Sequence, residues 1–267
     1  MIYDIRNTEY AKQTLSRLTE VPISVWKWYN YREQEYQCID DLVLDVVKKY
    51  GKLPDSYTDW QFVFFHITTS ANECESFNKH GILDLKHSYS CCDSELRKFL
   101  DDNNICIDLD AQELSYCGRK FDISFVSYPQ QDDTIDYYCW SIGRKLFYDY
   151  AVCGFLSICN ENPYGGMVHF RPEFLDDIDN LLGLDLSEKW ISTHNAYEIV
   201  AKVSGEKIVY DGYDDESEKD KVLKYLTIAY FNAFKEPDEK VLILKNNVQV
   251  PPSEILNIAS FQCWDNN

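Results

Sequence analysis

The chain has 267 residues, with 45 Asp and Glu against 26 Lys and Arg, so its formal net charge is −19. Non-specific nucleic-acid binding depends mainly on Lys and Arg that neutralise phosphates, so this balance argues against a general nucleic-acid binder. The 45% hydrophobic and 15% aromatic content excludes a disordered acidic tail, because such tails lack the apolar surface that offsets the entropy cost of ordering. The composition predicts a globular protein of one or two domains.

The N-terminal stretch is polar and charged, and no run approaches the roughly 18 apolar residues of a membrane span. We therefore expect a soluble, cytoplasmic protein with no membrane partner. The ten cysteines form no CxxC pair and no Cys–His spacing typical of zinc sites, so we expect no bound metal and disfavour a zinc or cysteine enzyme. Adjacent Cys91 and Cys92 are candidates for a redox pair, but Asp93 and Glu95 beside them disfavour a reactive thiolate.

Residues 1–58 are predicted to form a helical N-terminal segment that packs on the core. Asn7 or Thr8 can cap a first helix, and apolar residues recur at helical spacing between residues 39 and 50. The aromatic run at residues 26–31 has few cations near it. Because a base-stacking surface needs positive charge as well as aromatic rings, we favour packing over nucleic-acid binding for this run.

A buried strand is predicted over residues 61–68, which are apolar, β-branched and aromatic. Thr69 or Ser70 can then cap a helix over residues 71–79 that ends at Gly81. Further along, element boundaries are poorly defined between residues 117 and 159. The remaining pattern predicts a helix at 94–100, a strand at 166–170, a helix from Pro172 to Gly183, strands at 196–203 and 205–210, a helix at 217–234, and strands at 241–244 and 248–250.

A histidine motif in this region resembles the first motif of the ADP-ribosyltransferase fold, in the His-Tyr-Glu branch of poly(ADP-ribose) polymerases and bacterial toxins. The matching residues are His66 and Thr68 on the predicted strand, then a helix stopped by Gly81 and Ile82. The resemblance implies that His66 hydrogen-bonds a ribose of NAD and that Thr68 contacts the nicotinamide amide. A neutral imidazole can do this near pH 7, although a lone histidine ending an apolar strand is more often a satisfied structural residue.

The family's last motif is a glutamate just before a late strand, and Glu239 matches it, followed by the run 241–244 and by Pro251 and Pro252. The resemblance implies that Glu239 is catalytic, together with His66. A carboxylate there would hold a ribose hydroxyl and stabilise the oxocarbenium-like charge of the transition state. Asp238 is a weaker competitor, because adjacent strand residues point to opposite faces, and by default Glu239 is simply an exposed acid.

The middle motif has no clear match, and Tyr148, Tyr150 and Tyr164 are alternatives for its tyrosine, with Tyr150 the one we expect to bind NAD. His169 and Arg171 fall where the strand at 166–170 is predicted to meet a helix N-terminus, a position suited to an anion. Both are expected to bind NAD, with Arg171 on the pyrophosphate. The structural alternative is that Arg171 pairs with a nearby acid, Glu173 or Asp176.

The order of the elements predicts an α+β protein. The resemblance implies an ADP-ribosyltransferase-like domain over residues 59–267, with a split mixed or antiparallel sheet and flanking helices. The resemblance implies an NAD-dependent ADP-ribosyltransferase-like protein, an intracellular toxin or phage-defence effector with NAD as substrate and an antitoxin or partner protein. The charge favours a protein or small-molecule acceptor over a nucleic acid. The alternative is a catalytically inactive acidic protein that recruits a basic partner.

NAD is itself an anion, so the net charge of −19 also constrains this hypothesis. A cation beside the bound ligand must supply the local positive potential that the rest of the chain lacks. The candidates in the middle of the chain, between residues 103 and 188, are Arg119, Lys120, Arg144, Lys145 and Arg171.

Overall fold

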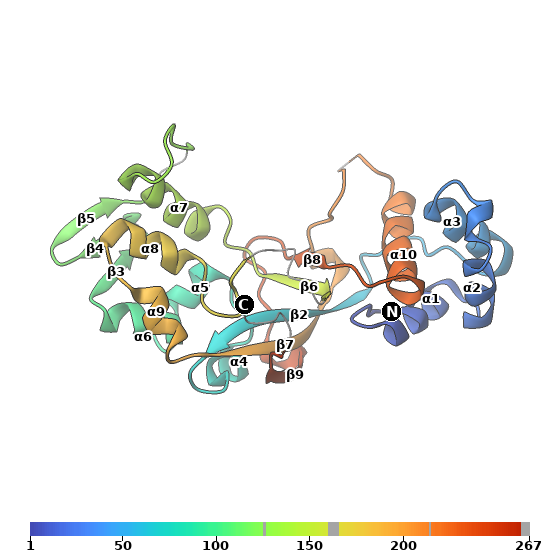
Figure 1. Ribbon diagram of the computed structural model, residues 1–267, viewed down its shortest axis with the longest axis horizontal. Coiled ribbons are helices and arrows are strands. Elements are labelled where there is room, and N and C mark those ends of the chain that lie inside the picture. The colour runs from blue at the N-terminus through green and yellow to red at the C-terminus, as the bar shows by residue number, and fades with distance from the viewer. Residues whose placement is uncertain (125–126, 160–165, 214, 263–267) are drawn as a thin grey trace.

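The computed structural model describes residues 1–124, 127–159, 166–213 and 215–262, and a six-stranded sheet forms its centre (Figure 1). A short strand, β1 (Ile2–Tyr3), pairs in parallel with β2, and every other pairing in the sheet is antiparallel. The other strands lie in the order β8 (Lys240–Ile243), β6 (Cys153–Ser157), β2 (Gln61–Ser70), β7 (Asn195–Ser204) and β9 (Ile255–Ser260).

The two neighbours of β2 are joined to it very unevenly. Strands β2 and β7 pair along their whole length, from Gln61 opposite Ser204 to Ser70 opposite Asn195. In the described part of the chain, β2 and β6 share a single register position, where Phe65 lies opposite Phe155. The sheet is therefore continuous, and the short pairing between β2 and β6 is here called the weak seam.

A group of four helices, here called the helical lobe, packs against one end of the sheet (Figure 1). Its core is continuous with the buried face of the sheet, which includes Phe62 and Phe64 of β2. Trp26 and Tyr29 of the aromatic run are buried in this core, whereas Trp28 and Tyr31 are exposed. The helices of the lobe are α1 (Thr8–Thr19), α2 (Ile23–Asn30), α3 (Ile39–Tyr50) and α10 (Glu218–Phe234).

Two of the predicted helix starts in this lobe are confirmed by their caps. The side chain of Asn7 accepts a hydrogen bond from the Tyr10 amide at 2.9 Å, and Ser217 does the same for the Asp220 amide at 3.3 Å. Such caps satisfy amides that have no partner inside the helix. Residues 1–58 thus supply three helices to a lobe that the late helix α10 completes.

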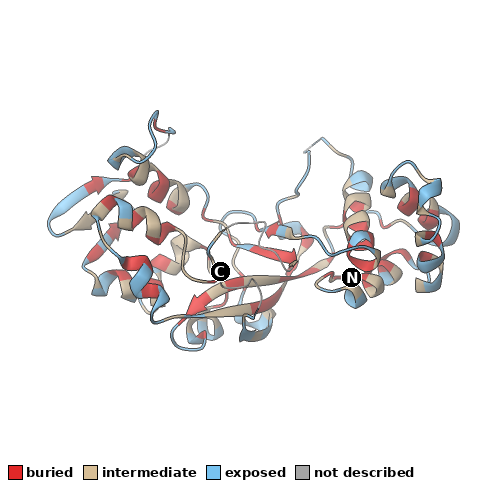
Figure 2. Ribbon diagram, viewed as in Figure 1, coloured by how far each residue is buried: buried red, intermediate tan, exposed pale blue. Residues whose placement is uncertain are grey.

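A second group, here called the β3–β5 lobe, lies at the other end of the sheet and has a separate hydrophobic core (Figures 1 and 2). Large buried side chains in this core include Phe174 and Trp190. Its strands form a small antiparallel sheet. The elements are α5 (Leu85–Ser90), α6 (Glu95–Asp102), β3 (Ile105–Asp108), β4 (Glu113–Tyr116), β5 (Arg119–Asp122), α7 (Ile135–Phe147), α8 (Phe174–Leu182) and α9 (Leu186–Ile191).

These elements confirm the predicted α+β class. They also confirm the strands predicted at 61–68 and 196–203 and the helix at 217–234. No helix in the described ranges is long and apolar enough to cross a membrane.

The helix predicted over residues 71–79 is shorter than expected, because α4 spans only Glu75–His80. Ser70 ends β2, and both Glu73 and Cys74 have positive φ angles, 57° and 62°. A left-handed conformation interrupts a right-handed helix, so the helix cannot start before residue 75. The hydroxyl of Ser70 accepts from the Cys74 amide at 2.9 Å and so stabilises a turn instead of the predicted cap.

The strand predicted at 166–170 is wrong. Residues 168–170 form a turn, in which the amides of Phe170 and Arg171 both donate to the Met167 carbonyl, at 2.8 and 3.0 Å. The strand predicted at 205–210 is also wrong, since a 3₁₀ turn covers Gly205–Lys207 and only an isolated bridge joins Ile208 to Leu244. Besides this bridge, the Val209 amide donates to the Ile243 carbonyl at 2.8 Å, so the segment follows the end of β8 without forming a regular strand.

Candidate functional site

A cavity of about 320 Å³ lies where the end of β2 meets the β3–β5 lobe. This volume is at the lower end of the range for small-molecule sites. Four residues expected to bind NAD, which are far apart in the sequence, line it together: His66, Thr68, Tyr150 and Arg171. His169 and Glu239 are not among its described lining residues.

His66 is held in a defined orientation at the weak seam of the sheet. Its Nδ1 atom lies 2.9 Å from the Cys153 carbonyl oxygen on β6. Because a carbonyl only accepts, Nδ1 carries the proton, and Nε2 of the neutral ring is left as an acceptor. Loss of hydration lowers the pKa of His66 from its ordinary value, and the hydrogen bond to Cys153 opposes this only in part. The ring is therefore neutral near pH 7 and can accept a hydrogen bond from a ligand hydroxyl.

The lowered pKa of His66 has a consequence for stability. As the pH falls through about 6.5, the unfolded chain protonates this histidine while the folded chain still resists protonation. We expect the free energy of unfolding to fall more between about pH 8 and about pH 5.5 for the wild type than for His66→Gln. Urea unfolding of both proteins at the two pH values measures this difference, and the other histidines cancel in the comparison. A stability difference that is the same at both pH values would contradict the prediction.

Thr68 lies on the same face of β2 as His66, two residues further along, as strand alternation requires. It also lines the cavity, opposite Tyr197 of β7. The next residue, Thr69, is buried and accepts a hydrogen bond from Trp190 Nε1 at 2.8 Å. This bond fixes the end of β2 against α9.

Of the three candidate tyrosines, Tyr150 is the one that lines the cavity. It is largely buried, and its hydroxyl donates to Asn247 Oδ1 at 3.0 Å. Tyr148 is about half exposed and is not a lining residue, and Tyr164 lies outside the described residues. The aromatic ring of Tyr150, and not its hydroxyl, is thus the part most available to a ligand.

The described lining carries two cations, Lys145 and Arg171, and both are already paired with carboxylates. Lys145 Nζ lies 3.1 Å from Glu173, and Arg171 forms an ion pair with Asp176. Arg171 thus pairs with a nearby acid, as the structural alternative predicted, and it also lines the cavity. Any anionic ligand must compete with these carboxylates for the two cations.

His169 and Arg171 do not follow the end of a strand, as was expected of this candidate anion site. Both precede α8, which starts at Phe174, and they lie in or next to the turn that replaces the predicted strand. His169 is buried, its ring centroid lies 4.0 Å from that of Phe170, and burial lowers its pKa. His169 therefore packs against Phe170 and is not among the described lining residues.

Glu239 lies immediately before β8, at the edge of the sheet next to β6. Two residues later Val241 lines the cavity, opposite Phe155, which in turn lies opposite Phe65. Residues directly opposite one another share a face of the sheet, so Val241 lies on the face of Phe65, and His66 lies on the other. The strand that follows Glu239 thus reaches the cavity from the face opposite His66.

Sequence reasoning missed the carboxylates that line the cavity: Asp84, Glu95, Asp149 and Glu173. Glu95 has a defined role, because its Oε1 accepts from the amides of Ala71 and Asn72 at 3.0 and 3.1 Å and from the Ser70 hydroxyl at 3.2 Å. It thereby holds the turn after β2 in place. An acid in the first turn of a helix is common, so the sequence contains no signal that separates Glu95 from other helix-start acids.

The charges of the cavity therefore differ from those expected of an open anion site. Four carboxylates and two cations are present in the described lining. A ligand with both hydroxyl groups and one anionic group fits this mixture better than a ligand with several exposed phosphates. Comparison of the chain with protein-family models, with curated protein sequences and with solved structures gave no match.

Proposed function

We propose that the chain is an ADP-ribosyltransferase-like protein that binds NAD in this cavity and transfers ADP-ribose from it. The observation that carries the proposal is that His66, Thr68, Tyr150 and Arg171 line one cavity although they are spread over more than a hundred positions. In this proposal Nε2 of His66 accepts from a ribose hydroxyl, the ring of Tyr150 packs on the nicotinamide, and Arg171 contacts the pyrophosphate.

The arrangement of the strands supports an ADP-ribosyltransferase-like split sheet as part of the proposal. The strand with the histidine, β2, is central, and the strand after Glu239, β8, lies at the edge beyond β6. The proposal takes the seam between β2 and β6, which share one register position, as the counterpart of the split. The proposal assigns to Glu239, which precedes β8 and lies outside the described lining, the carboxylate that stabilises the charge of the transition state.

The charge of the chain supports a protein or small molecule as the acceptor of ADP-ribose. A net charge of −19 repels nucleic-acid phosphates. We extend the proposal to a role as an intracellular toxin or phage-defence effector, with an antitoxin as partner. A basic antitoxin surface would fit this acidic chain.

Thermal unfolding with and without millimolar NAD tests the binding step. A ligand that binds only the folded state raises the melting temperature by mass action, so NAD is expected to raise it, and His66→Ala is expected to abolish the increase. Tyr148→Ala is the control, because Tyr148 is about half exposed and is not among the described lining residues. An unchanged melting temperature of the wild type with NAD would refute the proposal.

Release of nicotinamide from NAD tests the transfer step separately. Glu239→Gln is expected to bind NAD with a normal increase in melting temperature but to release nicotinamide at least about a hundredfold more slowly, as expected for loss of a group that stabilises a transition state. Equal release by wild type and Glu239→Gln would show that another carboxylate, such as Glu173, acts in its place.

A second candidate function, an inactive acidic binding protein, is favoured by the position of Glu239 outside the described lining. That candidate predicts no nicotinamide release by the wild type. It also predicts a stable complex with a basic partner that weakens steeply with salt, because screening removes attraction between exposed charges.

A further inference from the structure

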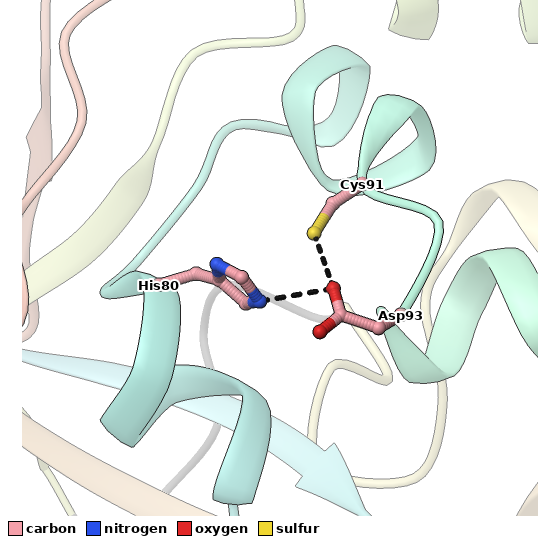
Figure 3. Close-up of side chains that lie close together, drawn as sticks. All are labelled: His80, Cys91 and Asp93. Carbon is pink, nitrogen blue, oxygen red and sulfur yellow. Dashed lines mark hydrogen bonds and ion pairs between the residues drawn. The ribbon is translucent and has the colours of Figure 1, made fainter.

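Three side chains that zinc commonly binds lie together outside the cavity lining: His80, Cys91 and Asp93 (Figure 3). One ligand atom from each residue lies within 4.8 Å of the other two. Cys91 Sγ donates to Asp93 Oδ1 at 2.9 Å, and His80 Nε2 lies 3.0 Å from the same oxygen. Figure 3 shows the three side chains converging from two separate segments of the chain.

Local structure fixes each of these side chains. His80 is the last residue of α4, and Gly81, with φ of 81°, turns the chain sharply away after it. An added Cβ at Gly81 would lie 1.9 Å from the Val250 carbonyl oxygen, so only glycine fits there. Cys91 caps the end of α5, and the Ser94 amide donates to its carbonyl at 3.1 Å. This turn brings Cys91 and Asp93 to the same side.

The donor set matches the chemistry of zinc. Imidazole nitrogen, thiolate sulfur and carboxylate oxygen are its usual protein ligands. Bonds of about 2.0–2.3 Å in tetrahedral geometry place ligand atoms roughly 3.3–3.8 Å apart. The two distances of 2.9 and 3.0 Å to Asp93 Oδ1 therefore need to open by only a few tenths of an ångström. The side chains of His80 and Asp93 are 26% and 33% exposed, so water can reach the fourth position.

A lysine also binds the carboxylate of Asp93 and adds a positive charge beside the cluster. Lys79 forms an ion pair with Asp93 through Oδ2, while His80 and Cys91 approach Oδ1. The ammonium group opposes a second cation nearby, but the Lys79 side chain is 63% exposed and can swing into solvent. It is therefore a competitor of the metal that is easily displaced.

We propose that His80, Cys91 and Asp93 bind a zinc ion, with water as the fourth ligand. On binding, the S–H bond of Cys91 breaks, a sulfur–zinc bond forms and the proton leaves to solvent. The ion ties the end of α4 to the turn between α5 and α6. Gly81 follows one ligand, and Ser94 follows another, and both line the cavity. The zinc therefore braces one wall of the cavity, and this proposal does not depend on the ligand that the cavity binds.

Cobalt titration of chelator-treated full-length protein tests the proposal. Cobalt bound to a thiolate gives a charge-transfer absorption, and this absorption disappears when zinc replaces the cobalt. One equivalent of cobalt is expected to give this absorption, and Cys91→Ser to lose it. His80→Ala and Asp93→Asn are expected to weaken cobalt binding at least about tenfold, and Lys79→Ala to strengthen it. Zinc is expected to raise the melting temperature of the wild type but not of Cys91→Ser.

Cys92→Ser is the matched control, since Cys92 is the adjacent and more exposed thiol and is not part of the cluster. It is expected to keep the charge-transfer absorption at one equivalent. An absorption that persists in Cys91→Ser would overturn the proposal, as would one that Cys92→Ser loses equally. The absence of any thiolate absorption in the wild type at one equivalent would overturn it too.

Discussion

Arg171→Ala is expected to weaken NAD binding about 10- to 100-fold, which corresponds to the roughly 1.5–3 kcal/mol of a hydrogen bond to a charged group. Arg171 and Lys145 are the cations of the described cavity lining, and the guanidinium group can contact a phosphate with two parallel hydrogen bonds. Calorimetric titration of NAD into both proteins at one fixed salt concentration measures the loss.

A second variant tests the competition that the ion pair implies. Asp176→Asn removes the charge that now pairs with Arg171, so it is expected to strengthen NAD binding several-fold. Arg119→Ala is the control, because Arg119 lies on β5 and is not a described lining residue. If Arg171→Ala binds NAD as tightly as Arg119→Ala does, Arg171 has no role in the cavity beyond its pairing with Asp176.

Gly154→Ala is expected to lower the free energy of unfolding by about 3 kcal/mol, the upper part of the range for an overpacked core. An added Cβ would lie 2.5 Å from a ring carbon of Phe64 and 2.5 Å from the carbonyl oxygen of Phe65. The ring can turn, but the carbonyl belongs to the backbone of β2, so β6 must move away from β2. Chemical denaturation monitored by circular dichroism measures the effect.

Gly118→Ala separates this steric effect from the general cost of losing a glycine. Gly118 has φ of 78° and no atom within 4 Å of an added Cβ. A left-handed conformation alone costs a non-glycine residue about 1 kcal/mol. A loss at Gly154 no larger than the loss at Gly118 would mean that the seam between β2 and β6 can widen freely.

The sequence predicts the long elements well, because their apolar and aromatic residues extend over many positions. Strand β2 and helix α10 show clear patterns and are found where expected. The strands of the β3–β5 lobe are four residues each, too short for alternation to stand out. The predicted start of α4 was wrong because the backbone of Glu73 and Cys74 has a left-handed conformation. The residue types glutamate and cysteine do not suggest this conformation.

The residues of the candidate site also differ in how far the sequence predicts their proximity. His66 and Thr68 are predictable as neighbours, since strand alternation puts residues two apart on one face. Tyr150 and Arg171 reach the cavity only through tertiary packing, so their candidacy rested on the resemblance and on charge. The cluster of His80, Cys91 and Asp93 has no sequence spacing typical of zinc sites, because the fold, and not one short motif, brings its two segments together.

The uneven joining of β2 to its neighbours gives the sheet a preferred line of opening. Strands β2 and β7 share ten register positions, whereas β2 and β6 share one in the described chain. Local opening starts where the least structure must be broken, and the register of β2 with β6 is much shorter than that with β7. We therefore expect β6 and β8 to exchange amide hydrogens before the pair β2–β7 does. His66 bonds to Cys153 across this seam. A ligand that contacts both β2 and β6 would therefore hold the two strands together, and the amides of β6 would exchange more slowly when the ligand is bound.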